Sequence, residues 1–382
     1  MHLFNQPRGG WAGVILLGLL GAVCWNLSSA QAAAPAEKGY FYTNDVVPQV
    51  PWSIHLVRLD RRRTDLELDT TMGRGKSFGM ETVSGQVAQI PPPAGKPVAA
   101  INGDYYNHDY SHAGDPHGIQ ICRGELVSAP NPSRVAFWVD AERNMHRGTI
   151  TSLFHVVWCN GAKIPLGLNE RRRPDSAVLY TAAAGHSTET QGGLEVALVS
   201  PTNQPWLPLR VGAVSQAKVL MVHETGNMLL RHDVAVISIG PRLAQGLPRP
   251  AVGSFLTIST ETMPNLKGAR TAIGGGPTLL SGGKPWKWPD LFQGRHPRSC
   301  IGWNKDFFYM MEVDGRQAGS DGMTYYEMAE YLKRLGCEEA INLDGGGSAT
   351  LWVDGRVVNR PSQGGERPAA NTLVLLQISN NK

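Results

Sequence analysis

Residues 306–344 read DFFYMMEVDGRQAGSDGMTYYEMAEYLKRLGCEEAINLD and carry the clearest periodicity in this chain of 382 residues. The continuous apolar run at 306–313 is typical of a buried strand. Thr324 and Glu327 match the T-x-x-E pattern of a capping box, which predicts that a helix begins there. Apolar residues then recur at helical spacing up to Gly336, a residue type that often caps the C-terminus of a helix.

A second apolar run at 339–343 completes a strand–helix–strand unit. Such crossovers nearly always join parallel strands. Asp314 and Asp344 then follow the carboxyl ends of the two strands, at the edge where open sheets of this kind bind ligands. Directly neighbouring strands would hold the two carboxylates about 5 Å apart, as in retaining glycosidases, whereas one intervening strand would suit an inverting enzyme. The sequence leaves this choice open.

This unit predicts an α/β (α+β) fold built on a mixed β-sheet and decorated by β-hairpins. Alternating residues at 52–60 and 64–72 indicate an early hairpin, and further hairpins are predicted at 118–130 and 134–150. From 151 to 265, short apolar segments alternate with Pro and Gly, which predicts a β-rich subdomain or insertion.

The chain begins with a segment typical of protein export. A basic start precedes an apolar run at 11–23, and Ala30, Gln31 and Ala32 form an A-x-A cleavage pattern. We therefore expect a signal peptide at 1–32, a linker at 33–40 and a secreted or periplasmic domain at 41–382. An uncleaved N-terminal anchor is the alternative. No later apolar stretch is long enough to cross a bilayer, so we expect no stable membrane insertion after cleavage.

Four cysteines remain in the expected mature chain: Cys122, Cys159, Cys300 and Cys337. They form no CxxC pair, so a zinc site of the usual spacing is not indicated. Two disulfides, in any of three pairings, are compatible with export, and small buried thiols are the alternative. The formal net charge is +4, but the arginine runs lack the interleaved aromatic residues of nucleic-acid surfaces. We therefore expect no nucleic-acid partner.

The second predicted strand is followed by Asp344, three glycines and Ser348. Three glycines in a row lose much conformational freedom on folding, and a loop that merely turned would not need them. They would let backbone N–H groups come close to an anionic or sugar ligand. The alternative is an Asx turn at Asp344 that leads into a tight hairpin.

Five ordered stretches resemble the phosphodiester glycosidase family and cover both ends of the expected mature chain. They are AAINGDYYN at 99–107, GARTAIGGGPTLL at 268–280, HPRSCIGW at 296–303, residues 312–355, and VVNRPSQGGERPAANTLVL at 357–375. One departure is Ser299-Cys300, where the family pattern has Thr-Ala. The middle of the chain, about 150–265, carries little of the resemblance.

The resemblance implies an enzyme that hydrolyses a sugar 1-phosphodiester at the anomeric carbon and releases a phosphomonoester. A phosphate group leaves readily, so the main requirement is a carboxylate that stabilises the oxocarbenium-like state or activates water. Carboxylates at matching positions are the catalytic candidates: Asp104, Asp314, Asp344 and Glu366. Residues at other matching positions are candidates for contacts with the sugar or the phosphate: Asn102, Gly275, Gly276, His296, Arg298, Arg316, Asn342, Gly345, Gly346, Gly347, Ser348, Arg367 and Asn371. For the three asparagines, fixing the turns around them is the alternative role.

We expect no cofactor and no metal. One loop does gather potential metal ligands, namely His108, Asp109, His112, Asp115 and His117. Gly114 and Pro116 interrupt this loop, however, and no helix fixes the spacing of the ligands. The expected partner is a glycosyl-phosphodiester small molecule or a bacterial envelope polysaccharide such as exopolysaccharide. Two rival functions remain: a metal-dependent phosphodiesterase that cleaves P–O, and a non-catalytic envelope-polysaccharide binder.

Overall fold

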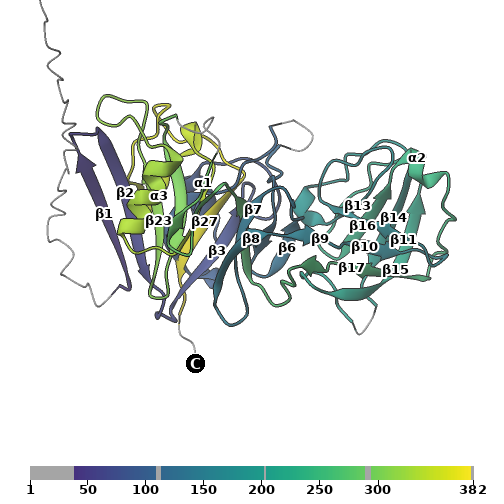
Figure 1. The fold of residues 1–382 in the computed structure, drawn as a ribbon. Coiled ribbons are helices and arrows are strands. Elements are labelled where there is room, and N and C mark those ends of the chain that lie inside the picture. The colour runs from purple at the N-terminus through teal and green to yellow at the C-terminus, as the bar shows by residue number, and fades with distance from the viewer. Residues whose placement is uncertain (1–37, 109–112, 202–203, 289–293, 380–382) are drawn as a thin grey trace, which may run out of the picture. The chain divides into compact units, whose positions relative to one another are not determined.

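The computed structural model describes residues 38–108, 113–201, 204–288 and 294–379 (Figure 1). The predicted signal peptide lies outside the described residues, as do most of the linker and two members of the histidine-rich loop, Asp109 and His112. Within the described ranges, no helix has both the length and the apolar character needed to span a membrane.

A seven-stranded sheet contains both strands of the unit at 306–344. In spatial order its strands are β1 (Tyr40–Val47), β2 (Trp52–Asp60), β23 (Phe307–Val313), β22 (Arg298–Trp303), β24 (Glu339–Asn342), β20 (Thr278–Ser281) and β21 (Lys284–Pro285). Each neighbouring pair is antiparallel. Because β22 lies antiparallel to both β23 and β24, those two strands run in the same direction without touching.

Two further antiparallel sheets have five strands each. The first has the order β26 (Arg356–Val357), β25 (Leu351–Val353), β4 (Lys96–Asn102), β27 (Asn371–Gln377) and β3 (Leu66–Met72). The second has the order β6 (Glu125–Ser128), β5 (Gln120–Cys122), β19 (Thr271–Gly275), β7 (Val135–Val139) and β8 (Met145–Thr149).

The segment between 151 and 265 forms an eight-stranded sheet and a short ribbon. The sheet has the order β11 (Lys163–Pro165), β10 (His155–Val157), β17 (Phe255–Ser259), β15 (Val214–His223), β14 (Leu194–Val199), β16 (Val234–Ile239), β13 (Ala177–Tyr180) and β12 (Gly167–Leu168). In the ribbon, β9 (Thr151–Ser152) pairs with β18 (Thr262–Met263) where the chain enters and leaves this segment.

Three α-helices occur in the described residues: α1 (Val83–Ala88), α2 (Pro241–Ala244) and α3 (Tyr325–Arg334). Three 3₁₀ turns accompany them: η2 (Pro92–Ala94), η4 (Ala182–Ala184) and η6 (Gly346–Ser348). The predicted capping box of α3 is confirmed, because the Thr324 hydroxyl accepts from the Glu327 N–H and the Glu327 carboxylate accepts from the Thr324 N–H.

The interior strands β22, β23 and β24 of the seven-stranded sheet are buried on both faces. On β23, Phe308 and Met310 face a core shared with the two five-stranded sheets, whereas Tyr309 and Met311 face α3 (Figure 1). The three sheets together enclose the shared core as a nearly closed, barrel-like arrangement. This double burial explains why 306–313 reads as a continuous apolar run.

The predicted α/β fold with a mixed sheet is therefore wrong, because the chain is mostly β. Among the described residues a single parallel pair occurs, β12 with β13, and it lies outside the seven-stranded sheet. The apolar run at 306–313 indicated a parallel α/β strand, but a helix that covers one face of an antiparallel sheet produces the same pattern.

The hairpin predictions have mixed outcomes. The hairpins at 118–130 and 134–150 are confirmed as β5–β6 and β7–β8. The early hairpin is wrong, because β2 pairs with β1 and β23 whereas β3 pairs with β27 in another sheet. The four described cysteines are free thiols, and three of them are buried.

Candidate active site

Asp344 follows the C-terminal end of β24, an interior strand of the seven-stranded sheet. Its Oδ1 accepts from the N–H of Gly345 at 2.9 Å, and its Oδ2 accepts from Nη2 of Arg367 at 3.3 Å. The side chain remains 13% exposed. Burial raises the pKa of Asp344, and contacts with Ser348 and Arg367 oppose this rise. Asp344 is thus a largely desolvated carboxylate that solvent can still reach.

The glycines after Asp344 allow a close approach of two backbone segments. A Cβ atom on Gly345 would lie 2.8 Å from the carbonyl oxygen of Pro297, and Gly346 has a φ of +62°. The Gly346 N–H donates to the same carbonyl of Pro297 at 2.8 Å. This packing explains why side chains are missing here, as the sequence suggested.

Three cationic or titratable side chains lie beside this glycine loop. The Arg298 guanidinium lies 4.2 Å from the centre of the Tyr325 ring, and its Nε and Nη2 donate to the backbone carbonyls of Met323 and Gly294. Nη2 of Arg316 lies 3.4 Å from Nδ1 of His296.

These side chains leave positive charge on one side of the glycine loop. A Cβ on Gly346 would lie 3.3 Å from Arg316, and a Cβ on Gly345 would lie 3.8 Å from Cδ of Arg298. Burial lowers the pKa of His296, and the charges of Arg298 and Arg316 lower it further. The carboxylate of Asp344 and this positive group therefore flank the same loop.

Tyr105 and Asn342 also lie at the site, and the charges of Asp344 and Arg298 both act on the Tyr105 hydroxyl. The Asn342 side chain donates from Nδ2 to the Tyr105 hydroxyl at 2.9 Å, whereas its buried Oδ1 has no hydrogen-bond partner in the described part of the chain. Burial raises the pKa of Tyr105, and the nearby charge of Asp344 adds to this rise. The Tyr105 hydroxyl therefore stays protonated and can donate a hydrogen bond.

Asp104 lies beneath this surface, and its side chain is fully buried. Its Oδ1 accepts from Nη2 of Arg134 at 3.0 Å, and the same Nη2 donates to the carbonyl of Gly275 at 3.1 Å. Burial raises the pKa of Asp104 to about 6, although Arg134 opposes the rise. The Arg134 guanidinium also lies 4.6 Å from the centre of the Tyr105 ring. The Asp104–Arg134 pair thus packs against the Tyr105 ring and fixes its position.

The remaining asparagines hold backbone turns. Asn102 donates to the carbonyl of Asp344 at 2.6 Å and accepts from the Ser299 hydroxyl at 2.6 Å. Asn371 accepts from the N–H of Asp104 at 2.8 Å. Both side chains are fully buried, so they fix the positions of the two aspartates.

Gly275 and Gly276 lie against the end of β24. A Cβ on Gly275 would lie 2.7 Å from the carbonyl oxygen of Asn342. The Gly276 N–H donates to that oxygen at 2.7 Å. These glycines therefore position Asn342. Ser348 accepts from Nε of Arg367 at 3.0 Å.

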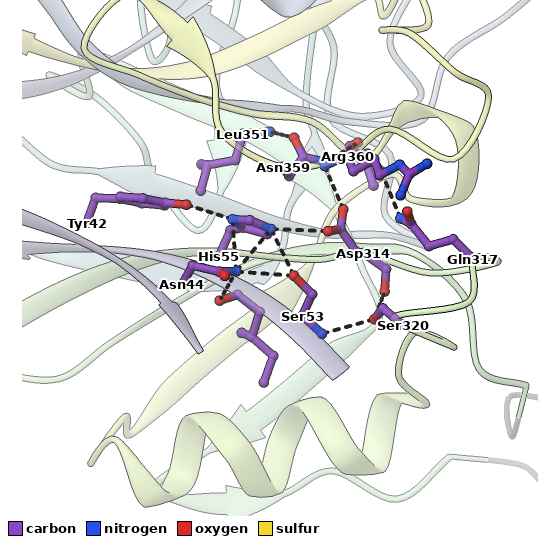
Figure 2. A network of polar contacts seen from close by, with 12 residues as sticks. Tyr42, Asn44, Ser53, His55, Asp314, Gln317, Ser320, Leu351, Asn359 and Arg360 are labelled. Carbon is purple, nitrogen blue, oxygen red and sulfur yellow. Dashed lines mark hydrogen bonds and ion pairs between the residues drawn. The ribbon is translucent and has the colours of Figure 1, made fainter. Parts of the chain in front are cut away.

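Asp314 and Glu366 make hydrogen bonds to other residues than those that contact Asp344. Asp314 follows β23, and its two oxygens contact Nε2 of His55 and the N–H of Arg360 (Figure 2). The Glu366 carboxylate binds the N–H and the hydroxyl of Ser84 at the start of α1. The contacts of Asp314 and Glu366 are therefore separate from those of Asp344.

Sequence reasoning missed several side chains near Asp344. Tyr105 and Tyr106 stand in the quoted NGDYYN stretch, but the sequence alone did not mark them as site residues. The charge of Asp344 acts on the pKa values of both tyrosines and of His117. Arg134 carries no signal in the sequence, because it lies in a loop far from the matching stretches.

The described members of the histidine-rich loop do not converge on a metal. His117 contacts Oδ1 of Asn107 at 3.2 Å, Asp115 accepts from Nδ2 of Asn107 at 3.1 Å, and the ring of His108 packs against Tyr106. Among the described residues, no group of three potential metal ligands forms in this loop. Asn107 and Asp115 also line an open pocket of about 930 Å³ that extends to 170–174.

Comparison with known proteins connects this site to a family. The phosphodiester glycosidase family model matches residues 211–376. An uncharacterized SPbeta prophage-derived protein of Bacillus subtilis, YomE, is 38% identical over 115 residues, which cover 28% of this chain and 18% of that protein. The N-acetylglucosamine-1-phosphodiester alpha-N-acetylglucosaminidase of Bos taurus is 41% identical over 66 residues, 17% of this chain and 12% of that enzyme. The chain thus spans less than a fifth of either relative.

Two solved structures share the fold. A hypothetical protein from Synechocystis superposes with a TM-score of 0.69 at 19% identity, covering 89% of this chain and 62% of the other. A Burkholderia pseudomallei protein, for which export has been suggested, superposes with a TM-score of 0.64 at 22% identity, covering 85% and 74%. At such identities the likeness concerns the fold alone. The family match covers residues 211–376, which include Asp344 and the glycine loop, and over these residues the chain is similar to the phosphodiester glycosidases.

Proposed function

We propose that this protein hydrolyses a sugar 1-phosphodiester at the anomeric carbon. The observation that carries the proposal is the position of Asp344. Its partly exposed carboxylate directly precedes the glycine loop, and Arg298 and Arg316 lie beside the same loop. A substrate that spans the loop can place its anomeric carbon at the carboxylate and its phosphate at the arginines.

Each side of this arrangement suits one part of the reaction. The C–O bond breaks heterolytically, so positive charge develops on the sugar and negative charge on the departing phosphate. Asp344 can stabilise the developing oxocarbenium ion or activate the attacking water, while Arg298 and Arg316 stabilise the phosphate through charge-assisted hydrogen bonds. The protonated Tyr105 hydroxyl can donate to a sugar or phosphate oxygen.

Asp344 is assigned the catalytic role because the other candidate carboxylates have partners elsewhere. Asp104 is fully buried against Arg134, Asp314 contacts His55, and Glu366 binds the start of α1. We therefore propose that Asp104 is a positioning residue that acts through Arg134 and Tyr105.

The position of bond cleavage tests this proposal. Purified protein should first be screened against nucleotide sugars and other sugar 1-phosphodiesters. For any substrate that turns over in water labelled with ¹⁸O, mass spectrometry is expected to find the label on the released sugar. Label on the phosphate would contradict C–O cleavage and favour a phosphodiesterase that cleaves P–O.

We also propose that the chain is exported and that its substrate belongs to the bacterial envelope or exopolysaccharide. The A-x-A pattern at 30–32 supports export, and so does the suggestion that the structural relative from Burkholderia pseudomallei is exported. N-terminal sequencing of protein recovered outside the cytoplasm is expected to give a chain that begins close to Ala33. A recovered chain that still begins at Met1 would contradict cleavage.

A further inference from the structure

Three side chains outside the proposed catalytic site form a buried group of potential metal ligands. His55 on β2 lies directly opposite Glu312 on β23, and Asp314 follows β23. One ligand atom from each of the three lies within 4.8 Å of the others. The exposed fractions are 6% for His55, 0% for Glu312 and 5% for Asp314.

Contacts around this group already orient two of the ligands. Nδ1 of His55 lies 2.8 Å from the Tyr42 hydroxyl (Figure 2). Its Nε2 lies 3.2 Å from Oδ2 of Asp314, from the Ser53 hydroxyl and from Nδ2 of Asn44. The other oxygen of Asp314 accepts from the N–H of Arg360 at 2.8 Å. Metal sites commonly use such contacts, with the second nitrogen of the histidine bound to a polar neighbour.

Glu312 supplies an independent observation. Neither of its carboxylate oxygens has a hydrogen-bond partner in the described part of the chain, although the side chain is fully buried. The amide of Asn359 donates to the carbonyl of Ala349 and also lies close enough to Glu312 to favour its charged form. A buried carboxylate without a partner is costly, and the neighbouring Asp314 adds a second acidic group. One divalent cation would balance two carboxylates and a neutral imidazole.

We propose that His55, Glu312 and Asp314 bind a structural Zn²⁺ ion, with one buried water as the fourth ligand of its tetrahedral shell. One imidazole nitrogen and two carboxylates form a donor set that zinc accepts, whereas Ca²⁺ and Mg²⁺ prefer oxygen ligands alone. Ligand atoms bound to one tetrahedral zinc lie about 3.3 Å apart. The separation of 3.2 Å between His55 and Asp314 is already close to this value.

Burial assigns this ion a structural role. A catalytic zinc needs a position open to water or substrate, and these ligands are almost completely covered. The ion would cross-link β2 to the end of β23 and so hold the turn that carries Arg316. The inference does not depend on the proposed function, because the site can be detected without substrate.

Metal binding to the full-length protein tests the proposal directly. Protein treated with a chelator and then dialysed is titrated with ZnCl₂, and zinc is measured by inductively coupled plasma mass spectrometry. We expect one zinc per chain. Glu312→Gln should weaken zinc binding by at least about a hundredfold, because loss of a residue that only hydrogen-bonds to a ligand already costs about 10- to 100-fold. Glu195→Gln is the matched control, because Glu195 is also fully buried but its carboxylate accepts from Thr188 and Thr190. This control should bind zinc normally.

Two measurements on the unaltered protein avoid any folding defect of the variants. Zinc should raise the melting temperature, and Co²⁺ bound in its place should give the visible absorption bands of a tetrahedral site. Failure of the unaltered protein to bind either ion would overturn the proposal and favour a protonated Glu312. Equal zinc affinity in folded Glu312→Gln would place the ion elsewhere and overturn it as well.

Discussion

Asp344→Asn is expected to lower kcat by at least about a hundredfold while the protein remains folded, because the change removes the charge that acts on the anomeric carbon. Asparagine has nearly the same size as aspartate, and its side-chain oxygen can still accept from the Gly345 N–H. Steady-state kinetics on a substrate from the screen, together with the melting temperature of both proteins, measure the effect. A transition-state role predicts that kcat falls much more than KM rises.

Asp140→Asn is the matched control for this experiment. Asp140 also lies at a turn and accepts from a backbone N–H, that of Asn144, at 2.8 Å. Its turnover should equal that of the unaltered protein. Near-normal turnover in Asp344→Asn would reduce Asp344 to a residue that shapes the turn.

Arg134→Met is expected to lower the free energy of unfolding by about 3 kcal/mol at neutral pH, because it leaves the fully buried carboxylate of Asp104 without its cation. Arg147→Met is the matched control. Arg147 pairs with Glu339, whose side chain is 29% exposed, so this change should cost less than about 1 kcal/mol. Urea unfolding followed by circular dichroism measures both. Equal losses in the two variants would contradict the buried-pair argument.

The cost of Arg134→Met should also depend on pH. Burial raises the pKa of Asp104 from 3.8 to about 6, so the folded protein holds this proton more tightly than the unfolded chain. The resulting stabilisation is complete below about pH 4 and is lost as the pH rises through 6. Without Arg134 the pKa rises further and the loss continues to higher pH. The difference between the two proteins should therefore be smaller at pH 5 than at pH 8.

Local signals in the sequence identified single elements well. The capping box at Thr324 and Glu327 marks the start of α3, and Gly336 follows its end with a φ of +81°. The parallel direction of β23 and β24 also follows from the handedness and length of the crossover. Each of these features depends on residues close together in the chain.

Pairing between distant segments could not be predicted in the same way. No local signal shows that β22 lies between β23 and β24, or that β2 flanks β23. A continuous apolar run reports burial on two faces, but it does not report whether the neighbouring strands are parallel. The fold class was wrong for this reason.

In the candidate site, too, local features could be predicted from the sequence and contacts between distant segments could not. The glycines after Asp344 predict that another backbone segment comes close, but they do not identify that segment, which contains Pro297. Arg134 could not be found, because its importance comes from Asp104 and Tyr105, which reach it only through folding. The contact between Asp314 and His55 could not be predicted either, because the two residues are 259 positions apart in the chain.

The segment from 151 to 265 has its two ends joined at the β9–β18 ribbon, an arrangement that suggests an exchangeable cassette. Its apolar residues, however, belong to the same core cluster as Ile121, Leu126 and Trp138 from β5, β6 and β7. Removing the segment would expose these side chains to water. The two ends of the segment mark a boundary along the chain, but the hydrophobic core continues across it. We therefore expect the eight-stranded sheet to unfold together with β5, β6 and β7, as one cooperative unit.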